Sequence, residues 1–162
     1  LEKKFKIDEF KSLFTFYYSG FNIRSSDFNA NIGINQLKKL KKISKIRFKN
    51  FKIYKEKLKN FWTQKSDLKL ISSFGYATFV KNRKEVFKYL KKKRIQTRPL
   101  ICGNMGQQPF LKSKFYQSKS KLEKAKFIDR YGIYLPNHAN FSSRDIDYIC
   151  KIFSKKAKPI FF

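Results

Sequence analysis

Few residues in this chain could carry out acid–base or nucleophilic chemistry. The only histidine is His138, in the segment LPNHANFS. The two cysteines, Cys102 and Cys150, show neither metal-ligand spacing nor a disulfide framework, so we expect two reduced, partly buried thiols. The sequence contains no G-x-S-x-G, no Walker loop and no G-x-G-x-x-G. It therefore predicts no complete catalytic set, and no metal site, within this chain.

A polar segment before the longest predicted helix is the second feature that could do chemistry. The stretch SGFNIRSSDF places Gly20, Asn22 and Arg24 directly ahead of that helix. From the residues alone, Asn22 is most simply a turn residue that hydrogen bonds to nearby backbone, and Arg24 a surface cation. The lone His138 is likewise more typical of a loop or a helix cap than of a catalyst.

The charge of the chain raises the question of nucleic-acid binding. Lys and Arg number 39 against 11 Asp and Glu, a formal net charge of +28. Clustered cations attract phosphate polymers, so a basic nucleic-acid-binding α/β module is one alternative. However, lysine greatly outnumbers arginine, whereas arginine usually makes the bidentate contacts to phosphates and bases. We expect nonspecific attraction of polyanions rather than dedicated recognition.

The element that follows Arg24 is a long amphipathic helix. Its length is about 35 residues, with Ser25 or Ser26 as the N-cap, and helices of this length often bridge two domains. Its apolar residues recur three to five positions apart: Phe28, Ile32, Leu37, Leu40, Ile43, Ile46, Phe51, Tyr54, Leu58 and Phe61.

Alternation and capping signals predict three strands and three helices after the long helix. A strand over residues 72–81 places Phe74, Tyr76, Thr78 and Val80 on one face. An N-x-x-E capping box at residues 82–85 begins a helix that ends near residue 93, and a second strand covers residues 95–101, with a proline at its edge or end.

The last part of the chain again alternates between helix and strand. A helix at residues 121–131 stops at Gly132, and a short third strand follows in IYLPNH. Ser142 caps a final helix whose apolar residues follow helical spacing, and the tail KKAKPIFF is expected to fray. The elements together predict an α/β (α+β-like) layer, a small sheet covered by helices. No apolar run is long enough to span a membrane, and no signal peptide is visible.

Three collinear segments resemble the pyridoxal-phosphate-dependent nucleotide-sugar aminotransferases of the DegT type. That family carries G-x-N-x-R and then a helix that reads roughly A-x-I-G-x-x-Q-L-K-K-L. The segment IQTRPLICGNMGQQPF resembles the family's T-R-P strand and loop, and its G-N is similar to the related sugar 3-dehydratases. YGIYLPNHANFSSRDIDYI resembles the family's ending. The residues that match the first segment are Gly20, Asn22, Arg24, Ala30, Ile32, Gly33, Gln36, Leu37, Lys38, Lys39 and Leu40.

The resemblance implies the small C-terminal domain of the aspartate-aminotransferase type of fold. Residues 1–24 would end the large cofactor domain, 25–62 would form the interdomain helix, 63–155 the small domain and 156–162 a tail. The family's Schiff-base lysine, or the histidine that replaces it in the dehydratases, lies further upstream than the 19 residues that precede Gly20. The resemblance therefore predicts a C-terminal fragment without catalytic residues, inactive by itself.

The resemblance also assigns roles to five residues. Asn22 and Arg24 match cofactor-binding positions of a site shared across a homodimer, and an amide or guanidinium N–H suits the phosphate of pyridoxal 5′-phosphate. Arg98, Asn104 and His138 match positions near the pocket for a nucleotide-linked keto sugar. The implied protein is cytoplasmic and takes part in surface-polysaccharide sugar synthesis. The alternatives are the basic nucleic-acid-binding module and a truncated, non-functional gene product.

Overall fold

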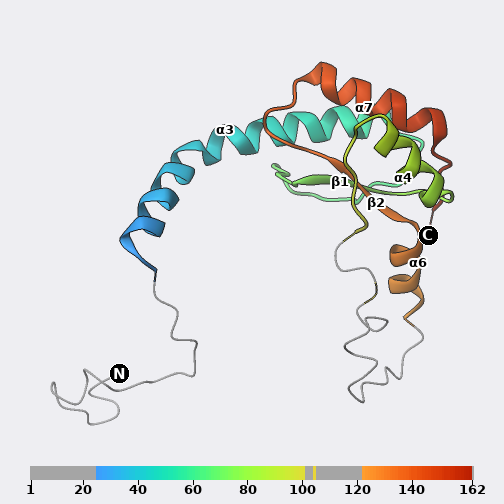
Figure 1. The fold of residues 1–162 in the computed structure, drawn as a ribbon, viewed down its shortest axis with the longest axis horizontal. Coiled ribbons are helices and arrows are strands. Elements are labelled where there is room, and N and C mark those ends of the chain that lie inside the picture. Colours follow the sequence, from blue (N-terminus) through green and yellow to red (C-terminus); the bar gives the residue numbers. More distant parts are fainter. Residues whose placement is uncertain (1–24, 101–103, 105–121, 162) are drawn as a thin grey trace, which may run out of the picture. The chain divides into compact units, whose positions relative to one another are not determined.

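A computed structural model describes residues 25–100, 104 and 122–161 of the chain. The chain divides into two compact units, Leu1–Leu37 and Lys38–Phe162. Within the described ranges the elements follow one another, as Figure 1 shows, in the order α3 (Asp27–Lys57), β1 (Gly75–Phe79), α4 (Arg83–Lys92), α6 (Glu123–Tyr131), β2 (Gly132–Pro136) and α7 (Ser143–Lys156).

The described part of the first unit is the beginning of α3. The Ser26 hydroxyl accepts a 3.3 Å hydrogen bond from the Asn29 backbone N–H, which confirms Ser26 as the residue that caps this helix. The apolar side chains here are exposed, with Phe28 at 74% and Leu37 at 67%. The predicted apolar face of the helix is therefore not covered in this unit by any described residue.

Burial along α3 begins only in the second unit. Asn50 and Tyr54 are buried, and so are Leu58 and Phe61 just beyond the helix. The helix has 31 residues and ends at Lys57, so it is shorter than the sequence predicted, and residues 58–60 form a turn.

The sheet consists of β1 and β2, which pair antiparallel. Tyr76 faces Leu135 and Thr78 faces Ile133 in the register, so these four side chains share one face of the sheet. All four are buried, which confirms the predicted inward side of β1. Phe74 is an exception: it lies before the strand, is half exposed, and packs its ring against Tyr134 at 5.1 Å.

The predicted middle strand is reduced to one bridge. Arg98 pairs with Tyr134 through two backbone hydrogen bonds, and no longer strand forms over residues 95–100. No other backbone hydrogen bond joins residues 95–100 to β2 within the part of the chain that the structure describes. The other edge carries a single bridge between Val80 and Pro159.

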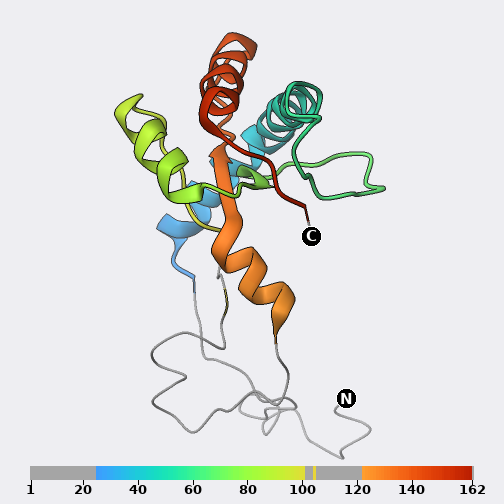
Figure 2. The ribbon, with the colours of Figure 1, turned by 90° about the vertical axis from the view of Figure 1, so that its right-hand side faces the viewer.

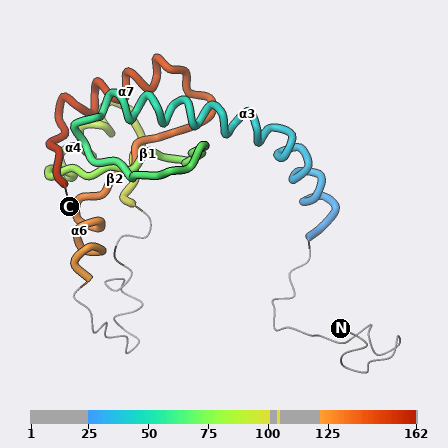
Figure 3. Tube along the Cα trace, turned by 180° about the vertical axis from the view of Figure 1, so that it is seen from behind, coloured from blue at the N-terminus to red at the C-terminus, as the bar shows by residue number. Residues whose placement is uncertain are grey.

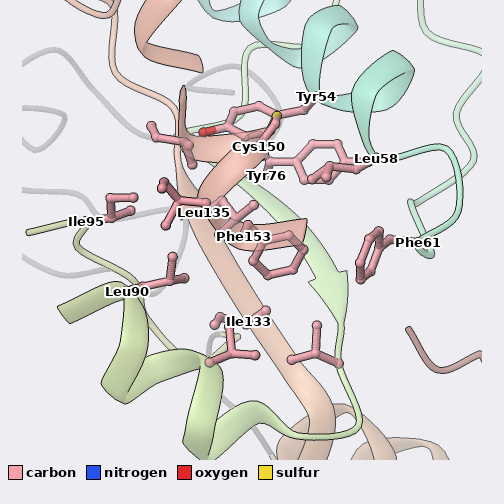
Figure 4. Close-up of a cluster of buried hydrophobic side chains, with 14 of the residues drawn as sticks. Tyr54, Leu58, Phe61, Tyr76, Leu90, Ile95, Ile133, Leu135, Cys150 and Phe153 are labelled. Atoms are coloured by element: carbon pink, nitrogen blue, oxygen red, sulfur yellow. The ribbon is translucent and has the colours of Figure 1, made fainter. Parts of the chain in front are cut away.

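Three helices cover the inward face of this sheet. In Figure 2, α4, α7 and the C-terminal part of α3 lie on one side of the strands, and the view from behind in Figure 3 agrees. Their side chains form one hydrophobic core, drawn in Figure 4. Fully buried members come from every layer: Tyr54 and Leu58, Tyr76 and Val80, Val86 and Leu90, Leu135, Ile146 and Phe153.

The beginning of α4 differs from the expected capping box. The Asn82 side chain makes no cap hydrogen bond to α4. Its Oδ1 instead accepts a 3.0 Å hydrogen bond from the Lys158 backbone N–H, and its Nδ2 donates 2.9 Å to the Lys156 carbonyl. The Lys81 N–H also donates to the Lys158 carbonyl at 2.9 Å. Residues 157–159 were expected to fray, but these contacts and the Pro159 bridge bind them to the domain.

The last two helix boundaries follow the sequence closely. Ser142 caps α7 in a capping box with Asp145, because each side chain accepts a hydrogen bond from the other residue's backbone N–H. The predicted apolar set on α7 is buried: Ile146, Ile149, Cys150 and Phe153. Helix α6 ends at Tyr131 and the chain continues directly into β2 at Gly132. None of the helices in the ranges that the structure describes is long and apolar enough to span a membrane.

Candidate functional site

A hollow of about 380 Å³ lies at the end of β2, beside α3. We call it the β2 hollow. It gathers the end of β2, the loop after it, the segment before β1 and one residue of α3. Its lining residues in the described part of the chain are Arg47, Phe74, Gly75, Gln96, Thr97, Arg98, Tyr134, Leu135, Pro136, Asn137, His138 and Phe141.

Helix α3 holds the Pro136–His138 segment of this hollow through three hydrogen bonds. The Tyr54 hydroxyl donates to the Pro136 carbonyl at 2.7 Å, and the Asn50 amide donates to the His138 carbonyl at 3.3 Å. The third hydrogen bond runs in the opposite direction: the Asn137 side-chain amide donates to the Arg47 carbonyl of α3 at 3.1 Å. Positions 47, 50 and 54 share one face of a helix, so a single stripe of α3 sets the backbone of this segment.

Asn137 is the most buried polar residue of the β2 hollow, with 1% of its surface exposed. Its Nδ2 donates both to the Arg47 carbonyl and, at 3.0 Å, to the Ser73 carbonyl. Its backbone N–H donates to the Phe74 carbonyl at 3.2 Å. Asn137 therefore joins α3, the segment before β1 and the end of β2 at one point.

Two guanidinium groups and an imidazole give the β2 hollow its charge and hydrogen-bonding character. Arg98 and His138 are exposed, whereas Arg47 is half-buried. No ion pair joins either arginine to a carboxylate within the described residues. His138 Nδ1 accepts a 3.1 Å hydrogen bond from the Asn140 backbone N–H, so Nε2 carries the proton of the neutral ring. Such a donor set binds anionic oxygens.

The sequence of the chain decides its family. The model of the DegT/DnrJ/EryC1/StrS aminotransferase family matches residues 3–154. This chain belongs to that family.

Relatives within the family include two curated proteins and one solved structure that are similar to this chain. The GDP-4-keto-6-deoxy-D-mannose 3-dehydratase of Yersinia pseudotuberculosis is 31% identical over 157 residues, which span 92% of this chain and 40% of that protein. The lipopolysaccharide biosynthesis protein RfbH of Salmonella typhimurium is 26% identical over 88% of this chain and 35% of its own length.

The solved structure is the E. coli GDP-4-keto-6-deoxy-D-mannose-3-dehydratase with bound hydrated PLP. It matches with a TM-score of 0.74 and 28% identity, covering 90% of this chain and 40% of that one. The predicted fold of the pyridoxal-phosphate enzyme family is therefore confirmed. The chain spans 35–40% of the length of these relatives.

Two of the predicted substrate-binding residues of this family member lie together. Arg98 and His138 both line the β2 hollow, although they are 40 positions apart in the sequence. Asn104 is buried at 2% exposure, and neither end of its side-chain amide has a partner among the described residues. It does not line the β2 hollow. Asn22 and Arg24, the predicted cofactor-binding pair, lie outside the described residues.

Sequence reasoning missed Arg47 and Asn137. Arg47 is the only arginine between Ser25 and Trp62, in a helix otherwise rich in lysine, and this singularity was a usable signal. Asn137 lies between the two residues that carried the match to the family's L-P-x-H ending. Its importance could not be seen there, because its partners are distant in the sequence.

The donors of the β2 hollow fit only part of pyridoxal phosphate. The guanidinium groups suit a phosphate, whereas the ring nitrogen needs a carboxylate and the aldehyde needs an amine. Asp, Glu and Lys are all missing from the described lining. The β2 hollow therefore fits the phosphate groups of a cofactor or nucleotide and not the reacting ring.

A metal cluster and a reactive thiol are both missing from the described residues. No cluster of three His, Cys, Asp or Glu residues there could hold a metal ion. Cys150 is buried in the core, where desolvation, with a smaller effect of Asp147, raises the pKa of its thiol to about 12. It stays protonated at neutral pH and is a poor nucleophile.

Proposed function

We propose that this chain forms the C-terminal part of an enzyme that uses pyridoxal 5′-phosphate to act on a nucleotide-linked keto sugar. The reaction is transamination or removal of the sugar 3-hydroxyl. Pyridoxal phosphate supplies the electron sink that acidifies a substrate carbon. The observation that supports the proposal is the meeting of Arg98 and His138, two of the predicted substrate residues, in one hollow whose guanidinium groups have no carboxylate partner among the described residues.

The β2 hollow binds the nucleotide-sugar part of the substrate in this proposal. Arg98 at the rim attracts the diphosphate, since a guanidinium forms paired hydrogen bonds with phosphate oxygens. His138 donates from Nε2, because its Nδ1 already accepts from Asn140. The α3 stripe fixes the backbone that carries His138, so the imidazole is held in place before the ligand arrives.

The cofactor contact belongs to the segment before α3. We assign Asn22 and Arg24 to the cofactor phosphate, in a site that a homodimer shares, with Asn104 as a third residue near the sugar. The names of the relatives support a place in the synthesis of deoxy or amino sugars for surface polysaccharide, in the cytoplasm. Duplex DNA is not a specific partner in this proposal.

Calorimetric titration of the chain with GDP-mannose, a stable nucleotide-linked sugar, tests the proposal. Replacing Arg98 with Gln removes charge-assisted hydrogen bonds worth about 1.5–3 kcal/mol, so the affinity should fall about tenfold or more. Arg144→Gln, on the exposed side of α7, is the matched control and should leave the affinity unchanged.

Two outcomes would contradict the proposal. One is equal weakening by Arg98→Gln and Arg144→Gln, which would indicate only a loss of net charge. The other is tight, sequence-dependent binding of duplex DNA at about 150 mM salt, the concentration range in which nonspecific phosphate contacts are weakened.

A further inference from the structure

Three polar atoms of residues that line the β2 hollow are unpaired within the ranges that the structure describes. They are Arg47 Nε, Thr97 Oγ1 and Asn137 Oδ1, each buried and without a hydrogen-bond partner among the described residues. Buried polar atoms in native proteins are nearly always paired, since an unpaired one loses its hydration without compensation. Three of them around one hollow indicate that something outside the described chain completes their hydrogen bonds.

The chemistry of Asn137 is fixed by its other contacts. Its Nδ2 faces two backbone carbonyls, those of Arg47 and Ser73, at 3.1 and 3.0 Å. Turning the amide over would place its oxygen against both carbonyls, so the orientation is set by the network. With 99% of the residue buried, Oδ1 is the one side-chain polar atom of Asn137 that has no hydrogen-bond partner among the described residues.

We propose that Arg47, Thr97 and Asn137 recognise the ligand of the β2 hollow, and that this ligand is a phosphate ester with hydroxyl groups beside the phosphate. We call these three the floor residues. Arg47 Nε–H donates to a phosphate oxygen, and Asn137 Oδ1 accepts from a sugar hydroxyl. Thr97 Oγ can do either. This inference rests on the proposed function and deepens it, because it names residues that select the diphosphate–sugar part of the substrate.

Other ligand classes fit the floor residues less well. Inorganic phosphate and pyrophosphate consist mainly of acceptors at neutral pH, so they match Arg47 well and offer Asn137 Oδ1 no donor other than a P–OH group. An apolar ligand would satisfy none of the three atoms. A hydroxylated phosphate ester offers both kinds of group within the roughly 380 Å³ of the hollow.

Ser73 provides an internal control for this proposal. Its hydroxyl is also buried without a partner, but Ser73 does not line the β2 hollow; it lines a neighbouring hollow beside Ile71. Only the Ser73 backbone carbonyl takes part in the Asn137 network. Thr97→Val and Ser73→Ala therefore both delete an unpaired buried hydroxyl, and only the first deletes one in the β2 hollow.

The experiment compares these two variants by calorimetric titration with GDP-mannose and with inorganic pyrophosphate. The single histidine adds a direct probe, because the ring proton resonances of His138 are the only imidazole signals of the chain. We expect Thr97→Val to weaken GDP-mannose binding about three- to tenfold, the usual effect of losing one neutral hydrogen bond. Ser73→Ala should bind as the unmodified chain does.

Arg47→Lys is the second variant, since it keeps the positive charge and removes the Nε–H. It should weaken the binding of GDP-mannose about tenfold, while Lys45→Arg, exposed on the same helix, should not change it. Neither Thr97 Oγ1 nor Arg47 Nε has a described protein partner to lose, so these variants should remain folded.

The outcomes separate this inference from the proposed function. Equal affinity for GDP-mannose in Thr97→Val and Ser73→Ala would overturn the inference and leave the proposed function standing. If pyrophosphate bound as tightly as GDP-mannose and Thr97→Val weakened both, the nucleotide-sugar function would be overturned while recognition by Thr97 would stand. No binding of either probe at millimolar concentration would overturn both.

Discussion

The Tyr54 hydroxyl on α3 donates a 2.7 Å hydrogen bond to the backbone carbonyl of Pro136 at the end of β2. The tyrosine is fully buried, and its burial raises the pKa of the phenol well above the usual value. The phenol is therefore neutral at neutral pH and can donate this hydrogen bond. Its ring also stacks on Tyr76 of β1, with the ring centres 4.9 Å apart. One side chain thus links the long helix to both strands and to the rim of the β2 hollow.

Replacing Tyr54 with Phe should lower the free energy of unfolding by about 1–3 kcal/mol, because the Pro136 carbonyl loses its buried donor while the ring stacking remains. Urea unfolding followed by the fluorescence of Trp62, the only tryptophan, measures the change. Tyr148→Phe on the exposed side of α7 is the control and should be neutral. Equal stability of both variants would show that the Tyr54 bond contributes nothing.

Two glycines should respond in opposite ways to alanine. At Gly132, an added Cβ would lie 2.5 Å from the Ile128 carbonyl oxygen and 2.7 Å from Leu100, so Gly132→Ala should cost about 1–3 kcal/mol. At Gly33, within α3, a Cβ meets nothing within 4 Å, and alanine should stabilise the helix by about 1 kcal/mol. Thermal unfolding of both variants tests this. A neutral Gly132→Ala would contradict the close contact.

The end of α4 contains a correctable strain. Arg94 has φ of 58°, and Ile95 N–H and Arg94 N–H donate to the Leu90 and Lys91 carbonyls, respectively. This is a Schellman motif in which glycine normally occupies the Arg94 position. Arg94→Gly should raise the free energy of unfolding by about 0.5–1 kcal/mol, because glycine adopts positive φ without a Cβ clash.

Lys92→Gly, two residues earlier and inside α4, is the control for the Arg94 substitution. It should destabilise the domain by about 1 kcal/mol, because glycine is a poor helix former. Denaturant unfolding distinguishes the two variants by sign. A loss of stability in Arg94→Gly would mean that the Arg94 side chain contributes more than its backbone conformation costs.

The N-cap of α7 predicts a pH dependence. The hydrogen bonds from the Ser142 hydroxyl and backbone N–H lower the pKa of Asp145. Because the folded pKa lies below the unfolded one, the ionised carboxylate stabilises the fold above about pH 4, and this contribution disappears as pH falls through the folded pKa. Asp145→Asn should remove this part of the acid dependence of unfolding. If the free energy of unfolding of Asp145→Asn fell at acidic pH as it does in the unmodified chain, Asp145 would not be the source of this pH dependence.

Ser142→Ala tests the same cap at neutral pH. It should destabilise the domain by about 1 kcal/mol, since the Asp145 backbone N–H loses its acceptor. Ser154→Ala is the matched control, the same substitution on the exposed side of the same helix. It should be neutral or slightly stabilising, because alanine is the better helix former. Circular dichroism during thermal unfolding measures both variants.

Capping residues and apolar spacing correctly predicted the features that depend on neighbouring residues in the chain. Ser26 and Ser142 cap their helices as expected, and α7 buries the apolar positions that its spacing indicated. The predicted capping box at residues 82–85 is wrong, because the Asn82 side chain hydrogen bonds to the backbone of residues 156 and 158. No local sequence pattern could show these distant partners. The predicted strand over residues 95–101 is wrong in the described residues, where only Arg98 pairs with β2. A local pattern does not reveal how far such a pairing extends, because the partner strand is distant in the sequence.

The sequence by itself determined the family, the order of the helices and of the two paired strands, and two of the residues that meet in the β2 hollow. Motifs and periodicity record these features because each depends on neighbours in the chain. Only the tertiary structure placed Arg47, Thr97 and Asn137 around the same hollow, with one polar atom of each unpaired within the described part of the chain. That arrangement depends on contacts across 90 positions, such as that between Asn137 and Arg47, which form when α3 packs against the end of β2.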